Sequence, residues 1–244
     1  MFHIVIPARF GSTRLPGKAL LPIADKPMVA WVWERAMQAG GAQVVVATDD
    51  QRIADEMTSR GAQVAMTRAD HASGTDRLAE VVEQLGWEEN AIVVNVQGDE
   101  PLMPVANIQR VAAMLNETQG ADMATLMEPL APTDAEQQSV VKVVASETGR
   151  ALYFRARRFL FTEKAGCRHP CSGISGFTPT GRVFSTPLWV GPLRRQSKAS
   201  RWSNCARWPT MRIFRLSWHP RPCPRASIPS PDLAAVRALL GAEQ

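Results

Sequence analysis

A run of cationic and hydroxyl side chains beside glycines opens this sequence. Residues 7–18 read PARFGSTRLPGK and supply three cations, two hydroxyls and two glycines. Glycines let backbone N–H groups approach phosphate oxygens, and Arg9, Arg14 and Lys18 can neutralise the phosphate charge. The spacing differs from the GxxxxGK[ST] pattern of P-loops. We therefore expect a phosphate-binding loop of another kind, in preference to a solvated basic turn.

A carboxylate beside a glycine marks the second segment, residues 95–101, which reads NVQGDEP. It follows the most apolar strand-like run of the sequence. A carboxylate at the carboxyl end of a strand is well placed to hold Mg²⁺ against a nucleotide phosphate. An Asp-Glu-Pro turn alone is usually only a turn. Together with the cationic loop, however, it predicts a magnesium site in this segment.

The third polar segment, residues 67–80, reads TRADHASGTDRLAE. Ser73 or Thr75 can cap the following helix, whose N-terminus attracts anions or base edges. Arg77 lies one turn into that helix, near the same edge. We expect His71 to be a surface loop histidine and not a catalyst.

The short segment TDD at residues 48–50 leaves two interpretations open. Its carboxylates can face a substrate, or they can cap the helix that follows. The sequence alone does not choose between these roles.

Residues 2–154 alternate short apolar runs with amphipathic stretches. Strands are predicted at residues 2–7, 43–47, 63–66, 91–96, 123–127, 140–145 and 151–154. Helices are predicted from Pro27 to the stop signal at Gly40, and at residues 50–60, 75–85 and 105–116. Such alternation favours an α/β fold with a mainly parallel sheet and helices on both faces. Ligands of these sheets bind at the carboxyl ends of the strands, where the three polar segments are expected.

The bulk composition is that of an ordinary globular chain. The sequence has 244 residues, of which 45% are hydrophobic, enough for one large α/β domain or one domain with a small lobe. No apolar run reaches the roughly 18 residues of a transmembrane helix, so we expect no membrane insertion. The N-terminus has no basic region ahead of an apolar run and does not resemble a signal peptide. A cytoplasmic location is therefore expected.

Charge is distributed unevenly along the chain. Residues 164–231 contain twelve Lys or Arg and no Asp or Glu, and they hold all four cysteines and ten of the eighteen prolines. The remaining residues carry 16 basic and 23 acidic groups, so the overall charge of +5 comes from this segment. A basic tail can bind nucleic acid and four cysteines can bind zinc, but CxxxC followed by two isolated cysteines is a poor zinc pattern. We expect neither partner.

Six strings carry a resemblance to a known family: PARFGSTRLPGK, ATDD, TRADHASGTDRLAEV, VNVQGDEP, MATL and VVKVV. In order and spacing, residues 2–154 resemble the CMP-Kdo synthetases, or 3-deoxy-manno-octulosonate cytidylyltransferases. The resemblance implies a nucleotide-diphosphosugar-transferase-like (Rossmann-like) fold and a homodimer. It also implies a Mg²⁺-dependent reaction of CTP with Kdo that yields CMP-Kdo and pyrophosphate for lipopolysaccharide.

The resemblance also implies roles for individual residues. Arg14, Lys18 and Asp99 are the expected catalytic residues, with Asp99 also the metal ligand. Triphosphate binding is expected from Arg9, Arg14 and Lys18, cytidine binding from Ala8, Ser73, Gly74 and Arg77, and a position near the sugar from Gln97.

Beyond Phe154 the resemblance stops, and residues 155–231 show neither helical nor strand periodicity. Read one frame over, residues 155–163, 170–185 and 200–208 can encode RAPIPFHR, LFRHIGIYAYRAGVL and ALEQLRAL, which resemble the family's sugar-binding and dimer-forming half. We therefore expect a nucleotide-binding core at residues 1–154, a frame-shifted remnant at 155–231, and a terminal helix at 232–244 in the normal frame.

A frame shift has a consequence for activity. The second metal-binding carboxylate of the family is missing from residues 226–230, which read ASIPS. We therefore predict that the chain as spelled is nearly inactive. Two alternatives stay open: a cytidylyltransferase for another sugar acid such as sialic acid, and a non-catalytic CTP-binding protein.

Overall fold

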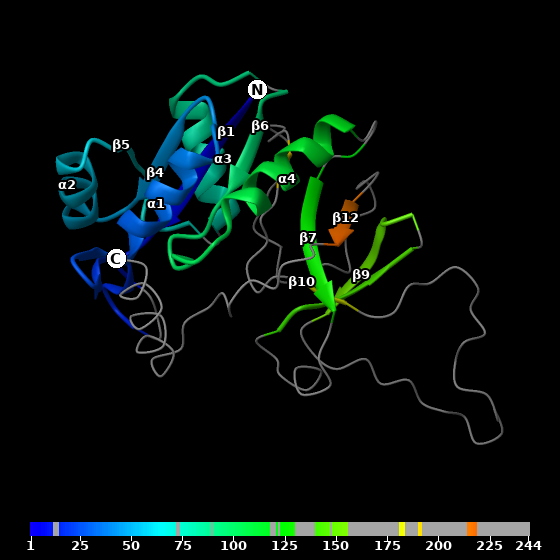
Figure 1. The fold of residues 1–244 in the computed structure, drawn as a ribbon. Coiled ribbons are helices and arrows are strands. Elements are labelled where there is room, and N and C mark those ends of the chain that lie inside the picture. The colour runs from blue at the N-terminus through cyan, green and yellow to red at the C-terminus, as the bar shows by residue number, and fades with distance from the viewer. Residues whose placement is uncertain are drawn as a thin grey trace.

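A central sheet with four parallel strands organises the N-terminal half of the chain in this computed structural model (Figure 1). The structure describes residues 1–11, 15–71, 74–88, 90–117, 121, 123–129, 140–146, 148–155, 181–183, 190–191 and 214–218. The parallel strands are β1 (Phe2–Ala8), β4 (Val44–Thr48), β5 (Gln63–Met66) and β6 (Ile92–Asn95). Their spatial order is β5-β4-β1-β6. The expected parallel α/β architecture is confirmed.

Alternation along β1 divides the core into two layers. Ile4 and Ile6 pack in one hydrophobic cluster, whereas Val5 packs in the other, because successive strand side chains point to opposite faces. All three side chains are fully buried. A strand buried on both faces appears in the sequence as a continuous apolar run.

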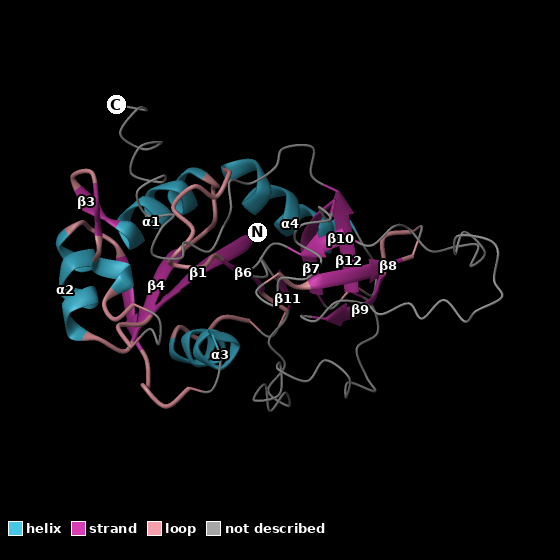
Figure 2. Ribbon diagram, turned by 90° about the horizontal axis from the view of Figure 1, so that it is seen from below, coloured by secondary structure: helices cyan, strands magenta, loops and turns pink. Residues whose placement is uncertain are grey.

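Four helices cover the two faces of the sheet (Figure 2). They are α1 (Met28–Gln38), α2 (Gln51–Ser59), α3 (Gly74–Gln84) and α4 (Val105–Glu117). Buried side chains of α1, α2 and α4 join the cluster that contains Ile4 and Ile6. Leu78 and Val81 of α3 pack on the opposite face, with Val5. This two-sided arrangement agrees with the sequence prediction.

The predicted elements agree with the observed ones to within two residues at each end. Three short elements were not predicted: the 3₁₀ helix η1 (Lys18–Leu20) and the two-stranded ribbon of β2 (Pro22–Ile23) and β3 (Lys26–Pro27). This ribbon rests on α1, where Lys26 pairs with Glu34 at 2.8 Å and lies over the Trp31 ring. Elements of two or three residues are too short to produce a periodic pattern.

The rest of the sheet contains antiparallel pairs. Strand β7 (Met123–Pro129) pairs antiparallel with β10 (Gly181–Val183), and β8 (Lys142–Ala145) pairs antiparallel with β9 (Ala151–Arg155). Strand β11 (Val190–Gly191) lies between β6 and β7, antiparallel to both. The strand–helix alternation did not predict this antiparallel part.

Three described strands, β10, β11 and one further strand, fall in the segment for which no periodicity was expected. The clearest is β12 (Phe214–Trp218), which pairs in parallel with β7 over five residues. Its sequence, FRLSW, places apolar side chains at every second position. The expectation of no strand pattern across residues 155–231 was therefore wrong at this position. The predicted terminal helix at 232–244 lies outside the described residues.

No helix in the described part of the chain is both long and apolar enough to cross a membrane.

Candidate functional site

Four polar loops follow the parallel strands and lie at one edge of the sheet. In register, Ala8 is level with Thr48, and Thr48 is level with Met66. Strand β6 runs in the same direction beside β1, with Asn95 level with Val5. Because parallel strands end at the same edge, the loops after β1, β4, β5 and β6 converge there. This edge carries the candidate site.

An ion pair joins the first and last of these loops. Nζ of Lys18 lies 2.7 Å from Oδ2 of Asp99. The side chain of Lys18 is 14% exposed and that of Asp99 is 34% exposed, so both can reach a ligand at the surface. The sequence analysis predicted that Lys18 binds phosphate and that Asp99 binds the metal. The structure brings them into direct contact.

Close backbone packing holds the loop after β6 against the end of β1. The Gly98 N–H donates to the carbonyl oxygen of Pro7 at 3.3 Å. A Cβ added at Gly98 would lie 2.9 Å from that oxygen and 3.3 Å from Cβ of Ala8. Only glycine allows this approach without a shift of the backbone. Gly98 thereby sets the position of the neighbouring Asp99.

An aromatic contact shapes the cationic loop. The Gly17 N–H donates to the carbonyl oxygen of Phe10 at 2.8 Å, and Gly17 has a φ of 71°. The guanidinium of Arg52 lies 3.5 Å from the centre of the Phe10 ring, a cation–π contact. Arg52 also pairs with Asp50 at 2.7 Å, and this hydrogen bond lowers the pKa of the Asp50 carboxyl. Phe10 thus ties the loop to the start of α2. Sequence reasoning did not single it out.

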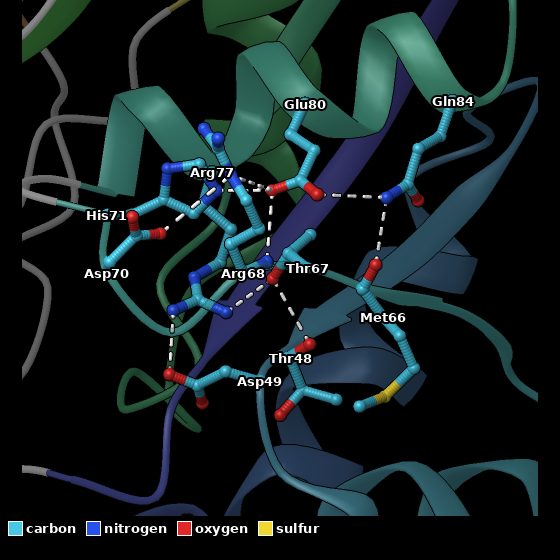
Figure 3. A network of polar contacts seen from close by, with 10 residues as sticks. All are labelled: Thr48, Asp49, Met66, Thr67, Arg68, Asp70, His71, Arg77, Glu80 and Gln84. Carbon is cyan, nitrogen blue, oxygen red and sulfur yellow. Dashed lines mark hydrogen bonds and ion pairs between the residues drawn. The ribbon is translucent and has the colours of Figure 1, made fainter.

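The structure gives Asp49 and Asp50 different contacts. Asp50 caps α2, since its Oδ1 accepts from the Arg52 N–H at 3.0 Å. Asp49 turns instead toward Arg77 of α3, with Oδ2 of Asp49 2.9 Å from Nη2 of Arg77 (Figure 3). The second terminal nitrogen, Nη1, donates to Oγ1 of Thr67 at 2.5 Å. Arg77 therefore bridges two of the loops.

His71 occupies a more buried position than predicted. Its side chain is only 5% exposed and its Nε2 contacts Oε2 of Glu80 on α3 (Figure 3). The expectation of a surface histidine was wrong because the loop folds back onto the helix. Burial acts to raise the pKa of Glu80, but hydrogen bonds from His71 and from the Arg68 N–H outweigh it and lower the pKa.

The remaining predicted residues lie around the same edge. Ala8 is buried at the end of β1, Arg9 is exposed directly after it, Gln97 follows β6, and Gly74 begins α3. Arg14 and Ser73 lie outside the described residues. Within the predicted set, the contacts join Lys18 to Asp99, whereas Arg77 contacts Asp49 and Thr67.

Comparison with known proteins finds relatives of this chain. A sequence model of the cytidylyltransferase family matches residues 3–168, extending past the predicted break at Phe154. A 3-deoxy-manno-octulosonate cytidylyltransferase of Pseudomonas fluorescens is 56% identical over 154 residues, which cover 63% of this chain and 61% of the relative. One of Methylococcus capsulatus is 50% identical over 175 residues, covering 69% and 68%.

The fold has a counterpart among solved structures. A structure described as CMP:2-keto-3-deoxy-manno-octonic acid synthetase complexed with CTP superposes with a TM-score of 0.79. It is 31% identical, and the match covers 100% of both chains.

In sequence, the match to the Pseudomonas relative spans 61% of that protein's length. The family model nevertheless covers more than half of this chain, and the structural match agrees with it. The resemblance seen in the sequence motifs is confirmed: the chain belongs to the cytidylyltransferase family.

Proposed function

We propose that this chain is a CMP-Kdo synthetase, with residues 1–154 as its nucleotide-binding part, which transfers CMP from CTP to Kdo and releases pyrophosphate. The observation that carries the proposal is the meeting of Lys18 and Asp99 at the carboxyl edge of the parallel sheet. In phosphoryl-transfer sites, cations commonly neutralise the triphosphate while a carboxylate binds the metal. The names of the relatives favour Kdo over other sugar acids. Since CTP is the donor, the cytoplasm is the proposed compartment.

The reaction depends on how the protein positions its substrates more than on covalent chemistry by the protein. The anomeric hydroxyl of the sugar acid would attack the α-phosphorus in line while pyrophosphate leaves. Lys18, with Arg9 and Arg14, would bind the triphosphate and neutralise the charge that develops on the leaving group. Ala8, Gly74 and Arg77, with Ser73, would hold the cytidine, and Gln97 would lie near the sugar.

Magnesium fits the residues present at this edge. Mg²⁺ prefers oxygen ligands and is usually bound by one or two carboxylates together with substrate phosphates. Asp99 offers such a carboxylate, partly exposed beside the cationic loop. Among the described residues no group of three or more His, Cys, Asp or Glu is arranged to hold a metal ion. Bound there, the ion would supply charge stabilisation for the phosphates.

Titration calorimetry with CTP, with and without Mg²⁺, tests the nucleotide-binding part of the proposal. We expect a dissociation constant in the micromolar to millimolar range, about that of substrates for typical enzymes, and tighter binding with Mg²⁺. GTP at the same concentrations is the control. If CTP produces no heat even with Mg²⁺ in excess, the proposal is wrong.

A second candidate function is CTP binding without turnover. It is favoured by the sequence of residues 226–230, which lacks the carboxylate expected there. A pyrophosphate-release assay with CTP and Kdo distinguishes the two, with sialic acid in a parallel reaction. If residues 155–231 are out of frame, as the sequence predicts, we expect turnover by the chain as spelled to be close to background. Sequencing the DNA around codons 154 and 230 tests the frame shift itself, and size measurement in solution tests the expected homodimer.

A further inference from the structure

A buried ion pair links the loop after β4 to helix α3. The side chain of Arg77 is 5% exposed and that of Asp49 is 15% exposed, with Nη2 and Oδ2 2.9 Å apart. The two residues are 28 positions apart in the chain. The sequence analysis left the role of Asp49 open between facing a substrate and capping the helix, and the family resemblance assigned it none.

The guanidinium of Arg77 is held on two sides. Besides Asp49, it donates to Thr67 Oγ1, and that hydroxyl in turn donates to the carbonyl oxygen of Thr48 at 3.1 Å (Figure 3). The Thr67 N–H donates to the same carbonyl oxygen at 2.8 Å. Asp49 and Thr67, the two residues that hold Arg77, therefore directly follow the paired neighbouring strands β4 and β5.

Stability alone is a weak explanation for such a pair. Burying two charges costs desolvation free energy that their attraction only roughly offsets, so apolar residues of similar size would serve equally well. Asp49 Oδ1 is also buried, and it finds no hydrogen-bond partner among the residues that the structure describes. Its carboxylate is thus not fully satisfied by the fold. What the pair does achieve is a single orientation for the guanidinium plane.

We infer that Asp49 is a positioning residue, which orients Arg77 toward the nucleoside end of CTP. The inference rests on the proposed function, in which Arg77 helps to hold the cytidine. A guanidinium carries five N–H donors, and the bonds to Asp49 and Thr67 do not exhaust them. Fixing its plane beforehand means that less side-chain entropy is lost when the nucleotide binds.

The test compares two ligands in the full chain: CTP, and inorganic tripolyphosphate, which has the phosphates but no nucleoside. Asp49→Asn keeps the shape of the side chain and removes its charge. We expect it to weaken CTP binding about tenfold, the effect of one lost charged hydrogen bond. Tripolyphosphate binding with Mg²⁺ should change by less than about twofold, because Lys18 and Asp99 are untouched. Asp55→Asn, at an exposed position of α2, is the matched control and should alter neither.

Double substitution tests whether Asp49 acts through Arg77. If it does, Asp49→Asn combined with Arg77→Met should bind CTP no more weakly than Arg77→Met alone. Thr67→Val removes only the neutral anchor and should weaken CTP binding in the same direction by a smaller factor. If Asp49→Asn fails to fold, Thr67→Val still tests whether the orientation of Arg77 affects CTP binding.

Each outcome of these experiments has one interpretation. Equal weakening of CTP and tripolyphosphate by Asp49→Asn would show a general structural role and overturn the inference. Unchanged CTP binding, or additive losses in the double variant, would also overturn it. If the unsubstituted chain does not bind CTP, with or without binding of tripolyphosphate, the proposed function is wrong. If it binds CTP and only the variants differ from expectation, the inference about Asp49 is wrong and the proposed function stands.

Discussion

Lys18 and Asp99 lie 81 positions apart in the sequence, yet Nζ of one is 2.7 Å from Oδ2 of the other. The pair joins the cationic loop after β1 to the acidic loop after β6. Each residue has a separate ligand in the proposed function, phosphate for Lys18 and metal for Asp99. In the structure the two charges neutralise each other. Under the proposed function, each residue would exchange part of this ion pair for its own ligand.

Replacing Lys18 by Met should weaken CTP binding. The substitution keeps most of the side-chain volume and removes a charged donor, and hydrogen bonds to charged groups contribute about 1.5–3 kcal/mol. We expect a loss of about 10- to 100-fold in affinity by calorimetry with Mg²⁺ present. Lys26→Met is the control, since it removes an ion-paired lysine on the ribbon beside α1. Affinity within about twofold of the original would contradict the assignment of Lys18.

Asp99→Asn should reduce the effect of Mg²⁺ on CTP binding. The amide is a neutral and weaker ligand for a hard cation than a carboxylate. In the original chain we expect CTP to bind more tightly when Mg²⁺ is added. In the variant, the ratio of the dissociation constants without and with Mg²⁺ should fall by about tenfold or more, the effect of one lost charged interaction. The two affinities are measured by calorimetry with magnesium and with a chelator. An unchanged magnesium effect would remove Asp99 from the metal site.

Gly98→Ala should destabilise the fold. Its Cβ would lie 2.9 Å from a backbone oxygen, so the loop or the end of β1 must shift. Such overpacking costs about 1–3 kcal/mol, measured as the free energy of unfolding in urea. Gly11→Ala is the matched control, because a Cβ there meets no atom of the described residues within 4 Å. Equal stability of the two variants would show that the close approach at Gly98 is unimportant.

Glu80→Gln should reduce stability at neutral pH but not in acid. The pKa of Glu80 is lowered in the fold from its ordinary value of 4.5, so the ionised form is favoured by folding. This contribution is present above pH 4.5 and is lost as the pH falls through the lower pKa of the folded state. Oε2 of Glu80 also accepts from the Arg68 N–H at 3.1 Å, and Gln can retain part of this bond.

We therefore expect a loss of about 1–2 kcal/mol in the free energy of unfolding at pH 7. The difference should narrow steadily below pH 4.5, as followed by urea unfolding at several pH values. Glu83→Gln, at an exposed position of the same helix, is the reference. A difference that stays constant down to pH 3 would mean that the Glu80 charge contributes nothing.

Much of the local structure could be predicted from the sequence. Among the described residues between 2 and 155, apolar periodicity located each strand and helix of at least four residues, because burial on one or two faces leaves a pattern in the chain itself. The loop chemistry was visible for the same reason: Lys18, Asp99 and Arg77 follow strands whose carboxyl ends must face one way in a parallel sheet. The alternation in Phe214–Trp218 was also available and was overlooked.

Pairing of side chains was decided only by the tertiary structure. Whether Lys18 meets Asp99, Asp49 meets Arg77 or His71 meets Glu80 depends on the strand order β5-β4-β1-β6 and on how the loops fold back onto α3. Periodicity assigns each residue to a face, but it carries no information about which strand lies beside which. Those neighbours are chosen by packing between distant segments, so the partners of a charged group appear only when the sheet is assembled.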